Sequence, residues 1–169
     1  ILVEQDVVAP VGIGLELLAA AVDRPPPALV AQEDGAQAVG DLVDRHAADE
    51  CLAALEQYGV VVYRDVHIAD GDLIDFSRML GEVVVVPTGE HERPEIQTIT
   101  MDPSKTNPRM AAYRKGNFFW HIDGCTPAVD ECPQMATVLS AKAVAETGGE
   151  TEFASTYAAF DDLTDAEKD

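Results

Sequence analysis

Apolar runs bounded by glycine or proline constrain most strongly what this chain can fold into. Residues 55–65 combine a Leu-Glu-Gln-Tyr segment, a glycine and a β-branched run. Because glycine commonly ends a helix and β-branched residues favour strands, this stretch predicts a helix that stops at Gly59 and a buried strand after it. Asp70 is expected to cap a second helix that ends at Gly81, and residues 83–86 are expected to form another short strand. The predicted order is helix, strand, helix, strand.

The second half of the chain also contains segments that predict strands and helices, with turn or capping residues at their ends. Residues 135–142 are a strand candidate, and the glycine pair before Thr151 predicts a turn that starts a further strand. Residues 155–160 predict a short helix capped by a hydroxyl side chain. Residues 164–167 have the spacing of a capping box, so one more helix is expected to start there.

A His-x-Asp pair, His121 and Asp123, lies in the apolar run of residues 117–123. On an extended strand, side chains two apart point to the same face, so the imidazole and the carboxylate can converge while Ile122 turns away. One imidazole and one carboxylate supply two-thirds of a 2-His-1-carboxylate facial triad, which binds non-heme Fe(II). The third ligand must come from elsewhere. Trp120, next to the pair, is expected to pack in the core.

Three segments in this order resemble one family. They are residues 59–65 (Gly-Val-Val-Val-Tyr-Arg-Asp), residues 119–123 (Phe-Trp-His-Ile-Asp), and Ala-Lys at 141–142 followed by Gly-Gly-Glu-Thr at 148–151. The chain is similar here to the Fe(II)/2-oxoglutarate-dependent dioxygenases of the taurine dioxygenase (TauD/TfdA) type. The similarity covers residues 48–169, which we interpret as the N-terminal part of one such domain.

The resemblance implies a fold, a reaction and a set of site residues. The fold would be mainly β with flanking helices, a double-stranded β-helix (a cupin-like jelly roll) that is incomplete in this chain. The reaction would use Fe(II), 2-oxoglutarate and O2 to hydroxylate or oxidatively cleave a small organic substrate, with release of succinate and CO2. His121 and Asp123 would bind the iron and act as the catalytic centre, Thr151 would hydrogen-bond a carboxylate of 2-oxoglutarate, and Asn117 would contact the substrate.

Two departures from the family pattern matter. Members carry a second iron-binding histidine and a 2-oxoglutarate-binding arginine late in the chain, whereas no histidine or arginine follows Asp123 here. We therefore expect the chain to be an N-terminal fragment of a longer enzyme and to be inactive alone. Taurine-specific members grip the sulfonate with a histidine and a tyrosine, and Val86 and Gly89 occupy those places. Taurine is not the expected substrate.

Other interpretations of the His-x-Asp motif stay open. The pair could lie on the surface, or the carboxylate could simply hold the ring N–H of the histidine. The chain could then be a non-catalytic jelly-roll binding module with a degenerate or truncated site. Alternatively, Cys125 and Cys132 could join His121 and Asp123 in a zinc site that stabilises the fold.

Composition limits the partners. The 11 basic and 31 acidic residues give a net charge of −20, which argues against binding to nucleic acid or to anionic membranes. Three cysteines and no basic leader predict a cytoplasmic protein without disulfides. Residues 1–47, broken by the prolines at 25–27, show no clear pattern and form a poorly defined N-terminal segment. The sequence does not decide whether the chain forms a homo-oligomer.

Overall fold

The structure is a computed structural model. It describes residues 2–6, 14–19, 31–33, 44–64, 66–85, 91–100, 102, 104–105, 108–114, 116, 119–124, 127–143 and 151–168. The strands are β1 (Leu2–Asp6), β2 (Gly14–Ala19), β3 (Ala31–Glu33), β4 (Val60–Arg64), β5 (Ile96–Thr100) and β6 (Ala136–Ala143). The helices are α2 (Arg45–Tyr58), α3 (Asp70–Leu80), α4 (Pro108–Arg114), α5 (Thr156–Asp161) and α6 (Asp165–Lys168). Among these, no helix combines the length and the apolar character needed to cross a bilayer.

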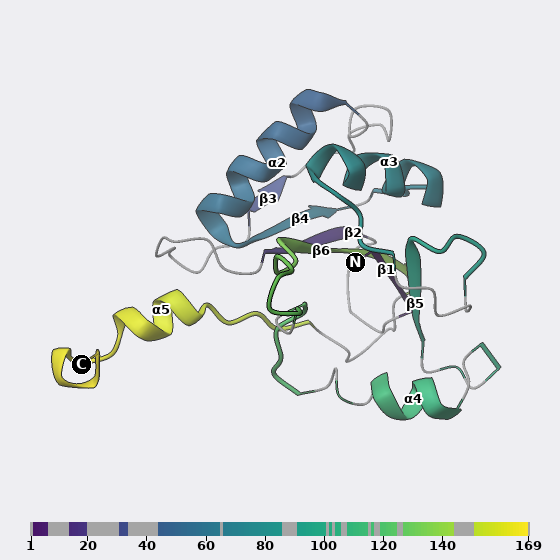
Figure 1. The fold of residues 1–169 in the computed structure, drawn as a ribbon. Coiled ribbons are helices and arrows are strands. Elements are labelled where there is room, and N and C mark those ends of the chain that lie inside the picture. Colours follow the sequence, from purple (N-terminus) through teal and green to yellow (C-terminus); the bar gives the residue numbers. More distant parts are fainter. Residues whose placement is uncertain are drawn as a thin grey trace.

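The described strands form one six-stranded mixed sheet in the order β3-β4-β2-β6-β1-β5 (Figure 1). Strand β2 is antiparallel to both β4 and β6, and β1 is parallel to both β5 and β6. Three of the strands come from residues 1–47, the segment in which the sequence showed no clear pattern. Because every described strand belongs to this single sheet, the second sheet of a jelly roll is not seen in the described part of the chain.

Helix α2 ends as the sequence predicted. The Asp44 carboxylate caps its first turn by accepting a hydrogen bond from the Ala47 N–H at 3.0 Å. At the other end Gly59 adopts the left-handed conformation (φ 77°), and its N–H donates to the carbonyl of Leu55 at 2.8 Å. The strand predicted after Gly59 is β4, so this prediction is also confirmed.

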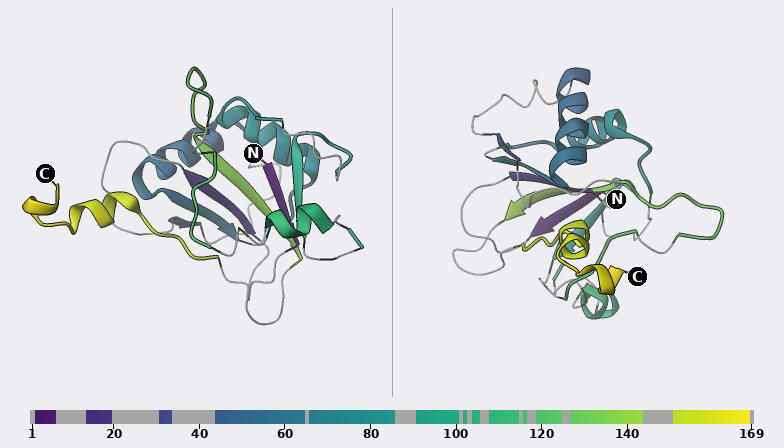
Figure 2. Two further views of the ribbon diagram at one scale, coloured as in Figure 1. Left: turned by 60° about the horizontal axis from the view of Figure 1, so that its bottom comes forward. Right: turned by 90° about the vertical axis from the view of Figure 1, so that its left-hand side faces the viewer.

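The core lies between the sheet and one pair of helices. Helices α2 and α3 lie side by side on one face of the sheet (Figures 1 and 2). Leu73 and Phe76 of α3 are fully buried in the same cluster as Val61 and Tyr63 of β4. The rings of Tyr63 and Phe76 meet edge to face, with centroids 6.4 Å apart, a geometry that adds to the area that they bury. Val138 brings β6 into this core.

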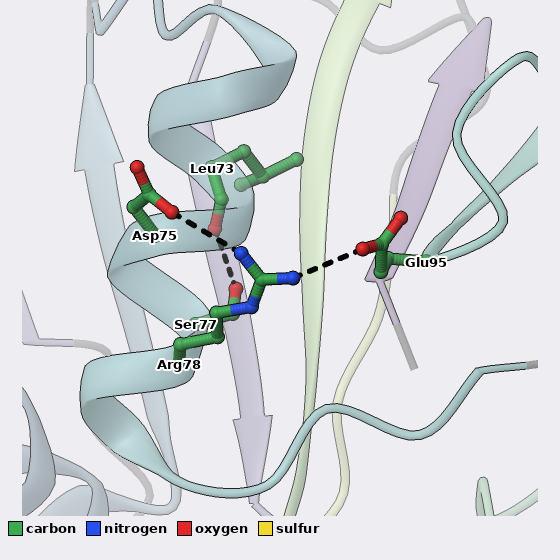
Figure 3. A network of polar contacts seen from close by, with 5 residues as sticks. All are labelled: Leu73, Asp75, Ser77, Arg78 and Glu95. Atoms are coloured by element: carbon green, nitrogen blue, oxygen red, sulfur yellow. Dashed lines mark hydrogen bonds and ion pairs between the residues drawn. The ribbon is translucent and has the colours of Figure 1, made fainter.

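An arginine joins α3 to the start of β5. Arg78 donates to the carboxylate of Asp75 at 3.4 Å, one turn earlier in α3, and to that of Glu95 at 3.0 Å (Figure 3). The adjacent Ser77 hydroxyl donates back to the Leu73 carbonyl at 2.7 Å. Because the Arg78 side chain is more than half exposed, these ion pairs contribute little to stability and act mainly on the orientation of the segment before β5.

Asp70 does not cap α3, contrary to the sequence prediction. The capping position is Ala69, which makes no side-chain hydrogen bond, and Asp70 is the first helical residue. The Asp70 carboxylate instead accepts from Lys142 Nζ at 3.0 Å and lies 3.4 Å from His91 Nε2. The Asp70 carboxylate therefore pairs with the distant Lys142 instead of a backbone N–H of its own helix. Gly81 does end the helix, in extended conformation (φ 173°).

Two predicted strands are absent from the described residues. The predicted strand at 83–86 has no regular structure over residues 83–85, where Val84 and Val85 are 41% and 49% exposed, and Val86 lies outside the described part. The strand predicted at Thr151 is likewise not formed, since residues 151–155 are irregular and the glycines before them lie outside the described residues. An apolar run forms a strand only where a neighbouring edge is available to pair with it.

The remaining predictions for the second half are confirmed. The candidate at 135–142 is β6, in the centre of the sheet. The Ser155 hydroxyl caps α5 by accepting from Ala158 N–H at 3.2 Å, and Glu167 reaches back to the Thr164 N–H at 2.9 Å, as a capping box requires. Neither α5 nor α6 has a buried residue, and both extend away from the sheet (Figures 1 and 2).

Replacing Gly59 by alanine should destabilise the fold by about 1 to 2 kcal/mol, because a Cβ atom is strained at its positive φ. Gly81→Ala is the matched control, since Gly81 also ends a helix but has an extended backbone and open space around its Cα. Urea unfolding of the three proteins measures the difference. Equal losses in both variants would contradict the role assigned to the left-handed cap.

Cys51 should make stability fall at alkaline pH. Burial raises the pKa of its thiol from 9.0 to about 11, and a hydrogen bond with Tyr63 opposes part of that rise. The contribution of the neutral thiol is complete below pH 9 and is lost as the pH rises toward 11, because the unfolded state ionises first.

The unfolding free energy of wild-type protein relative to Cys51→Ala should therefore decrease by about 1 kcal/mol per pH unit above pH 9. Cys132→Ala is the control, because Cys132 is exposed. A difference between wild type and Cys51→Ala that does not change with pH would show that the Cys51 thiol ionises equally in both states.

Candidate metal centre

His121 and Asp123 lie on a bend, and the prediction that they share a strand is wrong. Residues 119–124 have no strand pairing, and Gly124 adopts a left-handed conformation (φ 60°) that turns the chain directly after Asp123. The two side chains nevertheless converge, with His121 Nε2 3.4 Å from Asp123 Oδ1. The imidazole and the carboxylate therefore converge as expected, but a turn brings them together instead of the pleat of a strand.

The protonation of His121 follows from its second contact. His121 Nδ1 lies 2.7 Å from the carbonyl oxygen of Phe119. A carbonyl oxygen can only accept a hydrogen bond, so Nδ1 carries the proton and donates it. In the neutral ring, Nε2 then has a free lone pair, and Nε2 is the ring nitrogen that lies near Asp123. A backbone carbonyl that fixes the ring in this way is a common arrangement around metal-binding histidines.

The other oxygen of Asp123 is held by the sheet. Thr137, on β6, donates its hydroxyl hydrogen to Asp123 Oδ2 at 3.0 Å. Only 2% of the surface of Thr137 is exposed. Because successive side chains of a strand alternate, and Val138 faces the core under α2 and α3, Thr137 faces the opposite side of the sheet. The bend with the His-Asp pair is therefore tied to the face that these two helices leave free.

These donors fit a divalent cation. A lone pair on Nε2 and a carboxylate oxygen repel each other at 3.4 Å unless a proton or a cation lies between them. Two atoms at neighbouring positions, each about 2.1 Å from one ion, are about 3.0 to 3.4 Å apart, which is close to the observed separation. Both side chains are close to half exposed, so further ligands can approach. Within the described ranges, no third His, Cys, Asp or Glu completes a metal-binding group.

Gly124 allows the bend to approach the segment before β6. A Cβ atom built on Gly124 would lie 2.7 Å from the Cβ of Gln134, closer than real Cβ atoms come to other heavy atoms. The positive φ and the lack of space both require glycine here. Asp123 is therefore placed by the close approach of Gly124 to the Gln134 side chain and by the hydrogen bond from Thr137.

Comparison with known proteins identifies the family. The family profile described as "Taurine catabolism dioxygenase TauD, TfdA family" matches residues 23–169. The chain belongs to the TauD/TfdA family. It is also 33% identical, over 129 residues, to the "(S)-phenoxypropionate/alpha-ketoglutarate-dioxygenase" of Sphingobium herbicidovorans. That alignment covers 74% of this chain but only 42% of the relative. No solved structure matches the chain significantly.

The remaining residues predicted from the TauD/TfdA resemblance are only partly described. Thr151 is exposed, in an irregular segment, and has no described contact with the His-Asp pair. Asn117 lies outside the described residues, as do Val86 and Gly89. The structure therefore brings His121 and Asp123 together, and the functional roles of all four residues stay predictions.

Two further expectations concern the neighbours of the metal pair. Trp120 is 69% exposed, so the prediction that it packs in the core is wrong. Phe119 and Ile122 are also exposed, at 74% and 55%. For the zinc alternative, Cys132 is exposed and Cys125 lies outside the described residues, so the structure brings no described thiol to the pair.

Sequence reasoning missed Thr137 and a second polar group on the same strand. Lys142 Nζ donates to the Ile68 carbonyl and to Asp70 Oδ1, both at 3.0 Å, and His91 Nε2 lies 3.4 Å from Asp70 Oδ2. A signal for both was present, since Thr137 and Lys142 are, with Ser140, the polar residues at partly or fully buried positions of β6. A buried polar side chain needs a partner, and this requirement makes both residues candidates for such contacts.

Replacing Gly124 by alanine should weaken metal binding by at least about tenfold, because the bend must move away from Gln134 and take Asp123 with it. The measurement is the dissociation constant for Fe(II), titrated anaerobically into the complete protein. Gly116→Ala is the control, because Gly116 lies shortly before the bend and has open space for a Cβ atom. Unchanged affinity in Gly124→Ala would show that the bend does not set the position of Asp123.

Proposed function

We propose that the complete protein is an Fe(II)/2-oxoglutarate-dependent dioxygenase that acts on a small organic substrate. The observation that carries the proposal is the distance of 3.4 Å between His121 Nε2 and Asp123 Oδ1, in a chain that belongs to the TauD/TfdA family. The alpha-ketoglutarate dioxygenase named among its relatives supports the same class of cosubstrate. Since the alignment covers less than half of that relative, the activity is proposed for the complete protein.

In this proposal the described residues hold and orient the metal. His121 would bind through Nε2, because Nδ1 is occupied by the Phe119 carbonyl. Asp123 would bind through Oδ1, because Oδ2 accepts the Thr137 hydroxyl. When bound, Fe(II) with 2-oxoglutarate and O2 would supply the oxidation of the substrate, with release of succinate and CO2. The protein's own task is then to fix the ligand atoms and to leave the remaining positions on the ion open.

The other family assignments are part of the same proposal. Thr151 would hydrogen-bond a carboxylate of 2-oxoglutarate, and Asn117 would contact the substrate. A second histidine and an arginine would come from outside these 169 residues, since neither type follows Asp123 in the sequence. The described sheet would be one of the two sheets of a jelly roll, which is the fold that the family implies.

The substrate would be a small organic molecule other than taurine. The relative from Sphingobium herbicidovorans is named for an aromatic carboxylate, which supports a small organic acid as the first compound class to test. A protein with a net charge of −20 attracts such an anion only through local cations, so the bound metal would be an important positive charge at the site.

Replacing Asp123 by alanine should abolish 2-oxoglutarate-dependent succinate formation by the complete protein, because it removes the anionic iron ligand. The anaerobic absorption band of the iron–2-oxoglutarate complex should disappear with it, and His121→Ala should have the same two effects. Asp130→Ala is the matched control, since Asp130 is an exposed carboxylate a few residues away and should change neither readout. Wild-type succinate formation in Asp123→Ala would overturn the proposed function.

A further inference from the structure

We propose that Thr137 is a positioning residue that selects which oxygen of Asp123 faces the metal. The inference rests on the proposed function and concerns the same ligand pair. The Thr137 hydroxyl has a single hydrogen, and the structure directs it at Asp123 Oδ2 over 3.0 Å. The other oxygen, Oδ1, is the one that lies near His121 Nε2. The two oxygens of one carboxylate therefore have different partners before any metal is considered.

The hydrogen bond matters because the carboxylate is otherwise free to turn. The terminal torsion of aspartate is broad and roughly two-fold, so packing alone sets the carboxylate plane weakly. Asp123 lies on a bend next to the left-handed Gly124, with its side chain 39% exposed. Without a fixed donor, either oxygen or both could face the ion. Thr137 restricts the group to one oxygen and leaves the neighbouring positions on the metal open.

Thr137 is suited to this role because it is the most firmly placed of the three residues. It pairs with Leu18 in the antiparallel register between β6 and β2, at the centre of the sheet. It is 98% buried, so water does not compete for its hydroxyl. The far end of the same strand is fixed by Lys142, which donates to the Ile68 carbonyl and to Asp70. Strand β6 thus keeps the Thr137 hydroxyl in a fixed position, and the Asp123 carboxylate, which could otherwise turn, is oriented by its hydrogen bond to that hydroxyl.

The test compares variants of Thr137 in the complete protein. Thr137→Val keeps the shape and a strand-forming side chain but removes the hydroxyl, and Thr137→Ala removes it as well if valine disturbs folding. Thr137→Ser keeps the hydroxyl and is the rescue control. The readouts are the anaerobic dissociation constants for Fe(II) and Co(II), the visible absorption spectrum of the Co(II) protein, and the free energy of unfolding without metal.

Loss of the hydroxyl should weaken metal binding about 10- to 100-fold, the effect expected when an outer partner of a metal ligand is removed. It should also change the Co(II) spectrum, because the carboxylate would coordinate differently. Thr137→Ser should stay within about threefold of wild type. A purely structural role would lower the unfolding free energy without changing the spectrum, and that result would overturn the proposal.

The wild-type protein separates this proposal from the proposed function. Wild type that binds metal but shows no absorption band on addition of 2-oxoglutarate overturns the dioxygenase and leaves the role of Thr137 to be judged from the variants. Wild type that binds no divalent metal overturns both. Equal metal affinity and equal spectra in wild type and Thr137→Val overturn the role of Thr137 alone.

Discussion

His121 Nε2 and a carboxylate oxygen of Asp123 lie 3.4 Å apart, and the candidate site is built on this contact. In the neutral ring neither atom can donate to the other, because the Phe119 carbonyl holds the ring proton at Nδ1. Groups arranged in this way carry an electrostatic cost that a bound cation turns into a favourable interaction. The geometry of the bend therefore places two groups where a proton or a cation between them would be stabilised.

Strand β6 connects this contact to the rest of the fold. Its residues alternate between two faces, so Val138 enters the core beneath α2 and α3 while Thr137 reaches Asp123 on the opposite side. Lys142, on the same side as Val138, is tied to the start of α3. The packing of Val138 in the core therefore limits the movement of Thr137 on the other face of β6. Asp123 lies on a partly exposed bend, and its hydrogen bond to a buried strand fixes its position more closely than the bend alone would.

Local signals in the sequence predicted local structure well. The end of α2 at Gly59 and the strand that follows depend on neighbouring residues only, and both are present. The failures arose where distant residues decide the outcome. Asp70 has the chemistry of a helix cap, but Lys142, 72 residues away, takes its carboxylate. Residues 83–85 have the composition of a strand but find no edge to pair with in the described part of the chain.

In the candidate site, too, some features follow from the local sequence and others depend on distant residues. The choice of His121 and Asp123 needed only residue types and spacing, so it could be made from the sequence. The way in which they meet could not, because it depends on the positive φ of Gly124 and on a close contact with Gln134. Thr137 was also out of reach of motif reasoning, since it lies 14 residues from Asp123 and belongs to no recognised pattern. Only the demand of a buried hydroxyl for a partner points to it.

Three basic residues of the described part join α3 to other segments. At a net charge of −20, like charges oppose compaction, and a cation placed at a junction between elements reduces that repulsion where it is needed. Arg45 donates to the Met79 carbonyl and joins α2 to α3, Arg78 joins α3 to the segment before β5, and Lys142 joins β6 to α3. All three reach α3, whose buried side is already part of the core. Helix α3 is thus connected to the rest of the fold both through the apolar core and through these three cations. Strand β6, which Lys142 joins to α3, is in turn connected to Asp123 by the Thr137 hydroxyl.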